Sequence, residues 1–292
     1  MLDSNRVEIK YKKKETEKRI QRGMVLVRWR ERLIQPAAHL CSLKNSHLHF
    51  SDWKTGGLIL VYHRISDDPK DASDPFSVRS CVFKSHVSWL SRHYALLTAT
   101  ELVDRLKNHD DVKGTAVITF DDGHESLFTH AWPILRAYSA KATFFIQAGT
   151  LGHPLQLSKT QIIKMAEHGI EIGSHSVSHA DLRHVPESEM ISELSLSRGI
   201  LSEVAGMPIV GLAYPFGRFD DRVVDCVRRA GYSYACACLQ DRTNHPDDHF
   251  HRLARTEINR SDNEKRFHKK INGYYACAYN ILYRAASAFS RR

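Results

Sequence analysis

The sequence has no long apolar run, no paired cysteine motif and no internal repeat. No stretch approaches the roughly 20 apolar residues of a membrane-spanning helix, and the charged N-terminus lacks the apolar segment of a secretory signal. We therefore expect a cytoplasmic location. The six cysteines are scattered without a CxxC pair, which argues against a disulfide framework. What remains is a globular composition, with 42% hydrophobic and 26% charged residues in 292.

Positive charge is concentrated at the start of the chain. Residues 1–35 carry eleven Lys/Arg against five Asp/Glu, which accounts for +6 of the net charge of +9. We interpret this arm as a solvated extension, with contact to anionic lipid as the alternative. No nucleic-acid-binding motif accompanies the arm, so we expect no nucleic acid partner.

From Leu58 onward, short apolar runs alternate with amphipathic segments. The predicted strands are 58–62, 95–97, 116–120, 142–146, 170–173, 211–214 and 233–236. The predicted helices are 82–93, 101–108, 125–138, 159–168, 187–204 and 220–230. This alternation predicts an α/β fold with a parallel sheet, and the number of strands suits a closed barrel. The boundaries we expect are a basic, partly helical N-terminal extension (1–55), a barrel domain (56–260) and a C-terminal helical tail (261–292).

Polar motifs follow directly after four of the predicted strands. They are His63, the pair Asp121-Asp122, the pair His175 and His179, and the turn Pro215-Phe216-Gly217. In α/β barrels the loops after the strands build the active site at one face. We therefore expect these four clusters to converge on one rim.

The residue types at that rim indicate metal-assisted hydrolysis of an amide or ester. Asp122, His175 and His179 offer one carboxylate oxygen and two imidazole nitrogens, and three ligands leave room for water and substrate. Two adjacent carboxylates repel, so a division of work is expected: Asp122 binds the metal and Asp121 deprotonates the water. The backbone N–H of Phe216, after the stiff Pro215, could stabilise an oxyanion.

Three motifs resemble those of the polysaccharide deacetylases, also called carbohydrate esterase family 4 or the NodB homology domain. They are Thr119-Phe120-Asp121-Asp122-Gly123, His175-Ser176-Val177-Ser178-His179 and Ala213-Tyr214-Pro215-Phe216-Gly217. The resemblance runs from about residue 58 to 258. It implies a distorted (β/α)7 barrel and removal of N-acetyl groups from amino-sugar polymers. It also implies a divalent metal, with Zn²⁺ expected, held by Asp122, His175 and His179, and Asp121 as the base.

The chain departs from the family pattern at two positions. Ala213 stands where many members have an arginine that orients the base, and Leu253-Ala254-Arg255 stands where many have a Leu-x-His that supplies the general acid. With the early Tyr62-His63-Arg64, these changes resemble the branch that acts on poly-β-1,6-N-acetylglucosamine. By that match His63 is the expected general acid. His251 and Arg255 are the alternatives for that role or for substrate contact, and Arg255 is expected with Pro215 and Phe216 on the oxyanion and substrate side.

Each of these interpretations has a simpler alternative. Asp121 and Asp122 in isolation would read as a helix N-cap pair, and His63 as a buried histidine bonded to the backbone. Pro215-Phe216-Gly217 could be only a tight turn. The whole domain could be a catalytically impaired carbohydrate-binding pseudoenzyme, which Ala213 and Arg255 favour. An iron oxygenase is a third option, since two histidines and a carboxylate can hold Fe(II), but the second aspartate that precedes Asp122 argues against it.

Function and location are in tension, because deacetylation of an extracellular polymer requires export. The expected partner is an N-acetylated glycan, and a lipid-linked precursor at the inner membrane face would reconcile the two. Peripheral membrane contact would then run through the basic arm or through the tyrosine-rich C-terminal helix expected over residues 273–292.

Overall fold

A computed structural model of the chain describes residues 55–238 and 243–275. The predicted N-terminal extension, apart from Thr55, and the tail helix beyond Tyr275 lie outside the described residues. Within them, no helix combines the length and the apolar character that crossing a bilayer would require.

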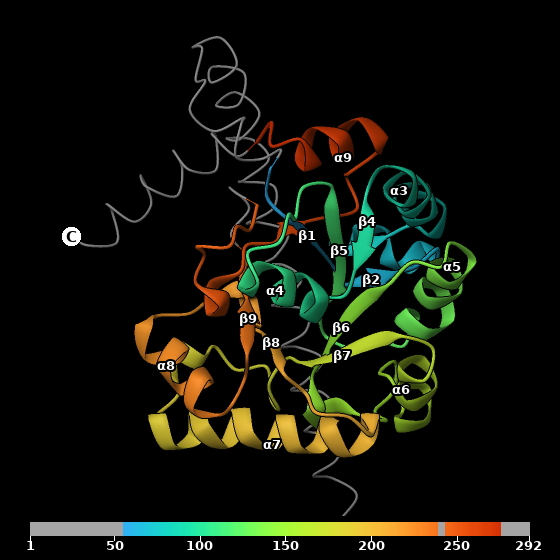
Figure 1. Cartoon of the computed structure of the whole chain (residues 1–292). Coiled ribbons are helices and arrows are strands. Elements are labelled where there is room, and N and C mark those ends of the chain that lie inside the picture. Colours follow the sequence, from blue (N-terminus) through green and yellow to red (C-terminus); the bar gives the residue numbers. More distant parts are fainter. Residues whose placement is uncertain (1–54, 239–242, 276–292) are drawn as a thin grey trace, which may run out of the picture.

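Eight parallel strands form a curled sheet in the described part of the chain, in the order β10-β1-β5-β6-β7-β8-β9, with β4 paired to β5 (Figure 1). The strands are β1 (Leu58–Tyr62), β4 (Ala95–Leu97), β5 (Thr115–Phe120), β6 (Ala142–Ile146), β7 (Ile170–Ser174), β8 (Gly211–Ala213), β9 (Tyr234–Cys236) and β10 (Thr256–Glu257). The sequence predicts all of these except β10, with bounds that agree within one residue. The predicted α/β fold is confirmed.

The sheet is irregular at two places. β4 pairs with the first half of β5 and β6 pairs with the second half, so β4 is wedged into one end of the ring of strands. The segment 253–257 meets both edge strands, because Leu253 pairs with Cys236 of β9 and Thr256 pairs with Leu60 of β1. Both edges of the curled sheet are therefore joined to one segment.

Helices cover the outside of the sheet (Figure 1). They are α3 (Ser80–His93), α5 (Trp132–Ala137), α6 (Lys159–Ala166), α7 (Glu187–Ala205), α8 (Asp221–Arg229) and α9 (Glu264–Ile271). α4 (Ala99–Lys107) instead packs against the interior side chains of the barrel. A π-helical turn (η2, Leu127–Ala131) leads into α5 where the sequence predicts one helix over 125–138. Pro133 explains the difference, since it has no N–H to continue regular α-helical bonding.

Short elements fill the connections. They are η1 (Pro69–Ser73), η3 (Ala148–Thr150), η4 (Leu182–His184), η5 (Pro215–Gly217), η6 (Phe250–Arg252), and the two-stranded sheet of β2 (Arg64–Ile65) and β3 (Ser77–Val78).

Alternation along the strands divides the core into two parts. Successive side chains point to opposite faces of a strand, so one set faces the outer helices and the other faces the barrel interior. The interior set packs with α4 and comprises, among others, Ile59, Val117, Phe145, Cys236, Leu253, Leu102 and Val103. α4 therefore closes the barrel at the end where the strands begin, and the end where the strands finish is left for the polar loops.

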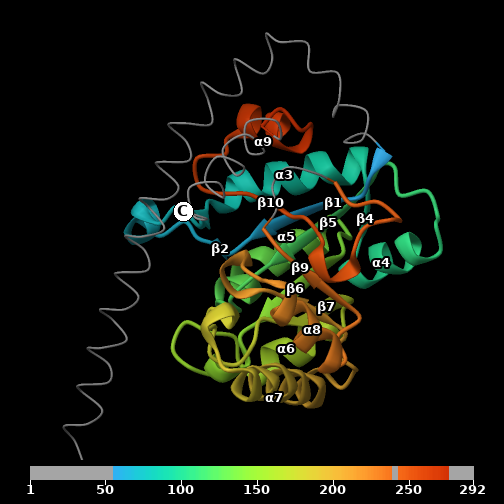
Figure 2. The same ribbon diagram turned by 90° about the vertical axis from the view of Figure 1, so that its left-hand side faces the viewer.

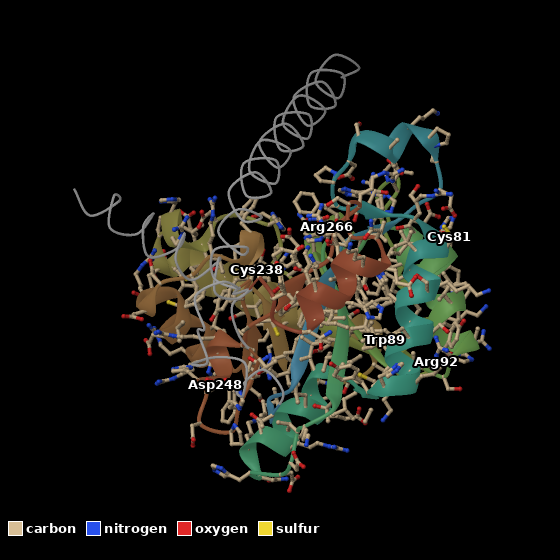
Figure 3. All side chains as sticks on the ribbon, turned by 90° about the horizontal axis from the view of Figure 1, so that it is seen from above. Cys81, Trp89, Arg92, Cys238, Asp248 and Arg266 are labelled. Atoms are coloured by element: carbon tan, nitrogen blue, oxygen red, sulfur yellow. The ribbon has the colours of Figure 1, made fainter. Side chains whose placement is uncertain are left out.

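α9 packs on α3 at one side of the barrel (Figure 2). The rings of His86 and Phe267 stack with their centroids 3.9 Å apart, and Trp89 meets Phe267 edge to face. Figure 3 shows Trp89 on α3 and Arg266 on α9. Beneath this contact the buried Lys270 pairs with the buried Asp262 at 2.5 Å and donates to the carbonyl of Glu257. The interface thus ties β10 to α3.

Candidate metal and hydrolytic site

The structure brings the polar residues that follow the strands to one rim, opposite α4. His63 follows β1, Asp121 and Asp122 follow β5, His175 and His179 follow β7, and Pro215 and Phe216 follow β8. Alternation explains the direction of two of these side chains. Asp121 lies four residues after the inward Val117, and His63 lies four residues after the inward Ile59.

Asp122, His175 and His179 offer ligand atoms that all lie within 4.8 Å of one another. The Oδ1 atom of Asp122 lies 3.5 Å from Nε2 of His175 and 3.4 Å from Nε2 of His179. Two ligands of one tetrahedral zinc ion, each bonded at about 2.0–2.1 Å, are separated by roughly 3.3 Å. The spacing of these atoms therefore fits a small divalent cation.

The hydrogen bonding of His175 supports the same conclusion. Its Nδ1 lies 2.8 Å from the carbonyl oxygen of Ala213, which can only accept, so Nδ1 carries the proton. Burial lowers the pKa of His175 despite the nearby carboxylates of Asp121 and Asp122, which favours the neutral ring. Nε2 then presents a lone pair toward the carboxylate of Asp122. Two electron-rich atoms face each other, an arrangement that a cation between them would stabilise.

The backbone at this rim adopts conformations that non-glycine residues seldom take. The φ angles of Asp122, Ser176, His179 and Phe216 are 75°, 62°, 60° and 59°. Such conformations cost on the order of 1–3 kcal/mol each and cluster at functional sites. The strained backbone supports a functional role for these loops, because it lowers stability without adding contacts.

Asp121 is paired with Arg255, which lies directly before β10. The guanidinium of Arg255 donates from Nη1 to Oδ1 of Asp121 at 2.7 Å and from Nη2 to Oδ2 at 2.8 Å. Burial alone would raise the pKa of Asp121, but the guanidinium of Arg255, aided by His175 and His63, holds that pKa below its usual value. Asp121 is therefore ionised and fixed in orientation.

Arg255 differs from our expectation. The sequence predicts it on the oxyanion or substrate side, or as a substitute acid, but its side chain is 0% exposed and its guanidinium is bonded to Asp121, Thr119 and the carbonyl of Ala237. It bonds to both oxygens of Asp121, which is the task that the family resemblance gives to an arginine at position 213. Alternation is the signal that could have found it, since Arg255 lies two residues after the inward Leu253 and therefore faces the same interior as Asp121.

His63 lies beside Asp121, close enough for its charged form to lower the pKa of that carboxyl. Its ring packs on Phe76 with centroids 4.8 Å apart, and its Nδ1 is buried with no hydrogen-bond partner in the described chain. The position suits the predicted acid. The simpler alternative, a buried histidine bonded to the backbone, lacks a backbone partner at Nδ1 among the described residues. His251 lies elsewhere, because its Nε2 is bonded to the carbonyl of Tyr232, which precedes β9.

Phe216 packs against His179, one of the candidate metal ligands. Its ring is 47% exposed and meets the ring of His179 edge to face, with centroids 4.5 Å apart. Arg218 lies over the Phe216 ring and donates to Asp181 at 3.2 Å. Pro215 is buried beneath this turn. The turn thus stands beside the site with an apolar ring open to solvent.

Comparison with known proteins agrees with this geometry. The family model described as polysaccharide deacetylase matches residues 108–235. The Bacillus subtilis protein YxkH is 30% identical over 176 residues, which cover 60% of this chain and 61% of that protein. A poly-β-1,6-N-acetyl-D-glucosamine N-deacetylase of Staphylococcus aureus is 27% identical over 215 residues, covering 68% of this chain and 73% of that protein.

Solved structures share the fold. A Streptococcus pyogenes deacetylase crystallised with acetate has a TM-score of 0.69 at 23% identity and covers 75% of this chain and 99% of its own. IcaB of Ammonifex degensii has a TM-score of 0.65 at 22% identity, and the match covers 76% of this chain and 97% of IcaB. The matched region contains the motif of Asp121 and Asp122, the motif of His175 and His179, and the Pro215 turn. Residues 108–235 of this chain are therefore similar to the polysaccharide deacetylase family, and the described fold is that of solved deacetylases.

Proposed function

We propose that this protein is a metal-dependent hydrolase that removes acetyl groups, chiefly N-acetyl groups, from an amino-sugar polysaccharide, oligosaccharide or lipid-linked glycan precursor. The observation that carries the proposal is an ionised Asp121, fixed by Arg255, directly beside the donor set of Asp122, His175 and His179. The N-deacetylase name of the S. aureus relative supports the choice of bond.

Asp122, His175 and His179 would hold the divalent metal, with Zn²⁺ as the first candidate. When bound, such an ion polarises a carbonyl oxygen and lowers the pKa of water. The carbonyl of Ala213 fixes the His175 ring in the tautomer that a ligand needs.

Asp121 acts in this proposal as the general base. Each of its oxygens accepts one bond from Arg255, which leaves further lone pairs to take a proton from the attacking water. His63, on the neighbouring strand end, donates a proton to the leaving amine. The turn of Pro215 and Phe216 borders the position of the oxyanion.

Replacement of Asp121 by Asn tests the base. The Asp121→Asn enzyme should bind zinc as the wild type does and release almost no acetate from N-acetylglucosamine oligomers, because an amide cannot accept the proton. The assay measures acetate and zinc content in the same sample. Chelator should abolish wild-type activity and added zinc should restore it. Full activity of Asp121→Asn would refute the assignment.

A pseudoenzyme that only binds glycan is the competing reading. Arg255 was one of its two supports, and its bidentate bond to Asp121 supplies the tether that Ala213 cannot. The remaining test is direct. Zinc-loaded protein that binds N-acetylated oligosaccharides but releases no acetate under any condition would favour the pseudoenzyme.

For location, we propose peripheral contact with the inner membrane face through the basic arm of residues 1–35. The net charge of that segment supports it. Co-sedimentation with anionic liposomes should be strong for the full chain and weak for a chain that lacks residues 1–35. Equal failure of both to bind would end the idea.

A further inference from the structure

The loop between the two histidine ligands depends on side chains for its backbone hydrogen bonds. Ser174 Oγ accepts from the N–H of Ser176 at 3.2 Å, and Ser176 Oγ accepts from the N–H of His179 at 3.0 Å. The two N–H groups between them belong to Val177 and Ser178. Both donate to the same oxygen, Oε2 of Glu193, at 2.9 Å each.

Glu193 is the one acceptor in this set that comes from a distant element. It lies in the second turn of α7, fourteen residues beyond His179, and reaches over to the loop. Its side chain is half-buried, and in the described part of the chain it has no cationic partner. The side chain of an acidic residue on a surface helix ordinarily points into solvent. Glu193 instead uses one oxygen to accept from two consecutive amides.

The opposite edge of the loop is held by main-chain bonds. The N–H groups of Ala148 and Gly149 donate to the carbonyls of Ser176 and Val177 at 3.0 Å each. The loop is therefore hydrogen-bonded to η3 on one side and to Glu193 on the other. Ser176 and His179 adopt positive φ angles, which persist only where surrounding contacts hold them. The backbone of the loop would therefore shift if the hydrogen bonds on one side were lost.

We infer that Glu193 is a positioning residue for the metal centre, which sets the distance between His175 and His179 by holding the amides of Val177 and Ser178. The inference rests on the metal site of the proposed function. It assigns to α7 a part in ligand geometry that the three ligand residues alone do not reveal. Residues that orient ligands in this indirect way typically change metal affinity by about 10–100-fold when removed.

Two conservative substitutions distinguish the effect of the length of the Glu193 side chain from the effect of its charge. Glu193→Gln keeps the length of the side chain and an oxygen that can accept from both amides, but loses the charge. Glu193→Asp keeps the charge, but is one methylene too short to reach them. Glu193→Ala removes both. Glu189→Ala is the matched control, since Glu189 is exposed one turn earlier on α7.

The affinity of the full chain for Zn²⁺ is measured by competition with a chromophoric chelator, and ligand geometry by the visible absorption of the Co²⁺ form. We expect Glu193→Asp and Glu193→Ala to bind zinc on the order of 10–100-fold more weakly, with altered Co²⁺ bands. Glu193→Gln should retain most of the affinity, and Glu189→Ala should match the wild type.

Three results would overturn the inference. Wild-type affinity and Co²⁺ spectrum in Glu193→Ala would show that the loop holds its shape unaided. A loss in Glu193→Gln with none in Glu193→Asp would mean that charge rather than reach matters. Absence of zinc binding in the wild type would remove the metal site of the proposed function, and this inference with it. If Glu193→Ala does not fold, the comparison of Gln with Asp still decides.

Discussion

At Asp121, two physical effects on one carboxyl group oppose each other and the charge effect wins. Burial favours the protonated acid, whereas two parallel bonds from the guanidinium of Arg255 favour the carboxylate. The pair is fully enclosed, with side chains that are 0% and 4% exposed. Removal of one member of such a pair leaves the other buried without compensation.

Arg255→Lys should reduce kcat while KM and zinc affinity stay near their wild-type values. A lysine keeps the charge but cannot make the two parallel bonds, so the base is free to turn, and misplacement of a catalytic group by about 1 Å can cost on the order of 10²-fold in rate. Steady-state acetate release measures the effect. Arg252→Lys is the control, because Arg252 lies at the surface against Asp221. Unchanged kcat in Arg255→Lys would contradict the assigned role.

Asp121 and Arg255 also contribute to the fold. Arg255→Ala should lower the free energy of unfolding by about 3–5 kcal/mol, since it leaves Asp121 as an unpaired buried charge. Urea unfolding measures it. A loss below about 1 kcal/mol, typical of exposed ion pairs, would mean that water reaches the site in the variant.

At the scale of elements, the contact of α3 with α9 contains a titrating group. His86 is buried against Phe267 and bonded to the hydroxyl of Tyr62 at 3.1 Å. Burial, followed by the neighbouring charges of His268 and Lys270, lowers its pKa to about 3. Between about pH 6.5 and pH 3, the imidazole of His86 is therefore neutral in the folded protein, whereas the same group takes up a proton in the unfolded chain.

The His86 contribution to stability should be complete above pH 6.5 and should decline as the pH falls from there toward 3. In that window the unfolded state binds one more proton than the folded state, so protonation favours unfolding, by about 2 kcal/mol at pH 5. Urea unfolding across the window should give a shallower pH dependence for His86→Gln than for the wild type. His93→Gln, at an exposed position of α3, should leave the slope unchanged. Equal slopes for all three proteins would show that His86 does not titrate this way.

Two glycines should respond oppositely to alanine. A Cβ on Gly149 would lie 2.5 Å from the carbonyl oxygen of Val177, which accepts the hydrogen bond from Gly149. A Cβ on Gly199 in α7 meets nothing within 4 Å. Gly149→Ala should lower the free energy of unfolding by about 1–3 kcal/mol. Gly199→Ala should raise it by about 0.5–1 kcal/mol. Thermal unfolding of the two variants side by side gives the answer, and a Gly149→Ala protein as stable as the wild type would be the contrary result.

For the whole molecule, zinc should stabilise the folded state. A ligand at 100 times its Kd that binds only the folded protein raises the free energy of unfolding by about 2.7 kcal/mol. Thermal unfolding with and without zinc should show this shift, and EDTA should reverse it. His179→Ala should abolish the shift. The same shift in that variant would place the bound zinc among other histidines of the chain.

The strands were predictable because buried parallel strands are short, nearly continuous apolar runs. The rim residues were predictable because they follow those runs. β10 was not, since Thr256–Glu257 contains no apolar residue and is defined only by its pairing with β1. Glu193 could not be recognised either, because an acidic residue on a helix normally faces solvent and its two amide partners depend on how α7 packs. Arg255 could have been found from alternation, but only if the extended segment from Leu253 to β10 had been predicted.

The pairing of Asp121 with Arg255 spans 134 residues, and it fixes the order in which the site can be completed during synthesis. All three proposed metal ligands have left the ribosome when residue 179 emerges, whereas the arginine follows 76 residues later. At bacterial or eukaryotic elongation speeds of about 5–20 residues per second, that delay lasts roughly 4–15 s. A nascent chain thus contains both histidines well before Asp121 has its arginine partner, so the proposed hydrolysis would require that the segment that joins the two sheet edges has docked.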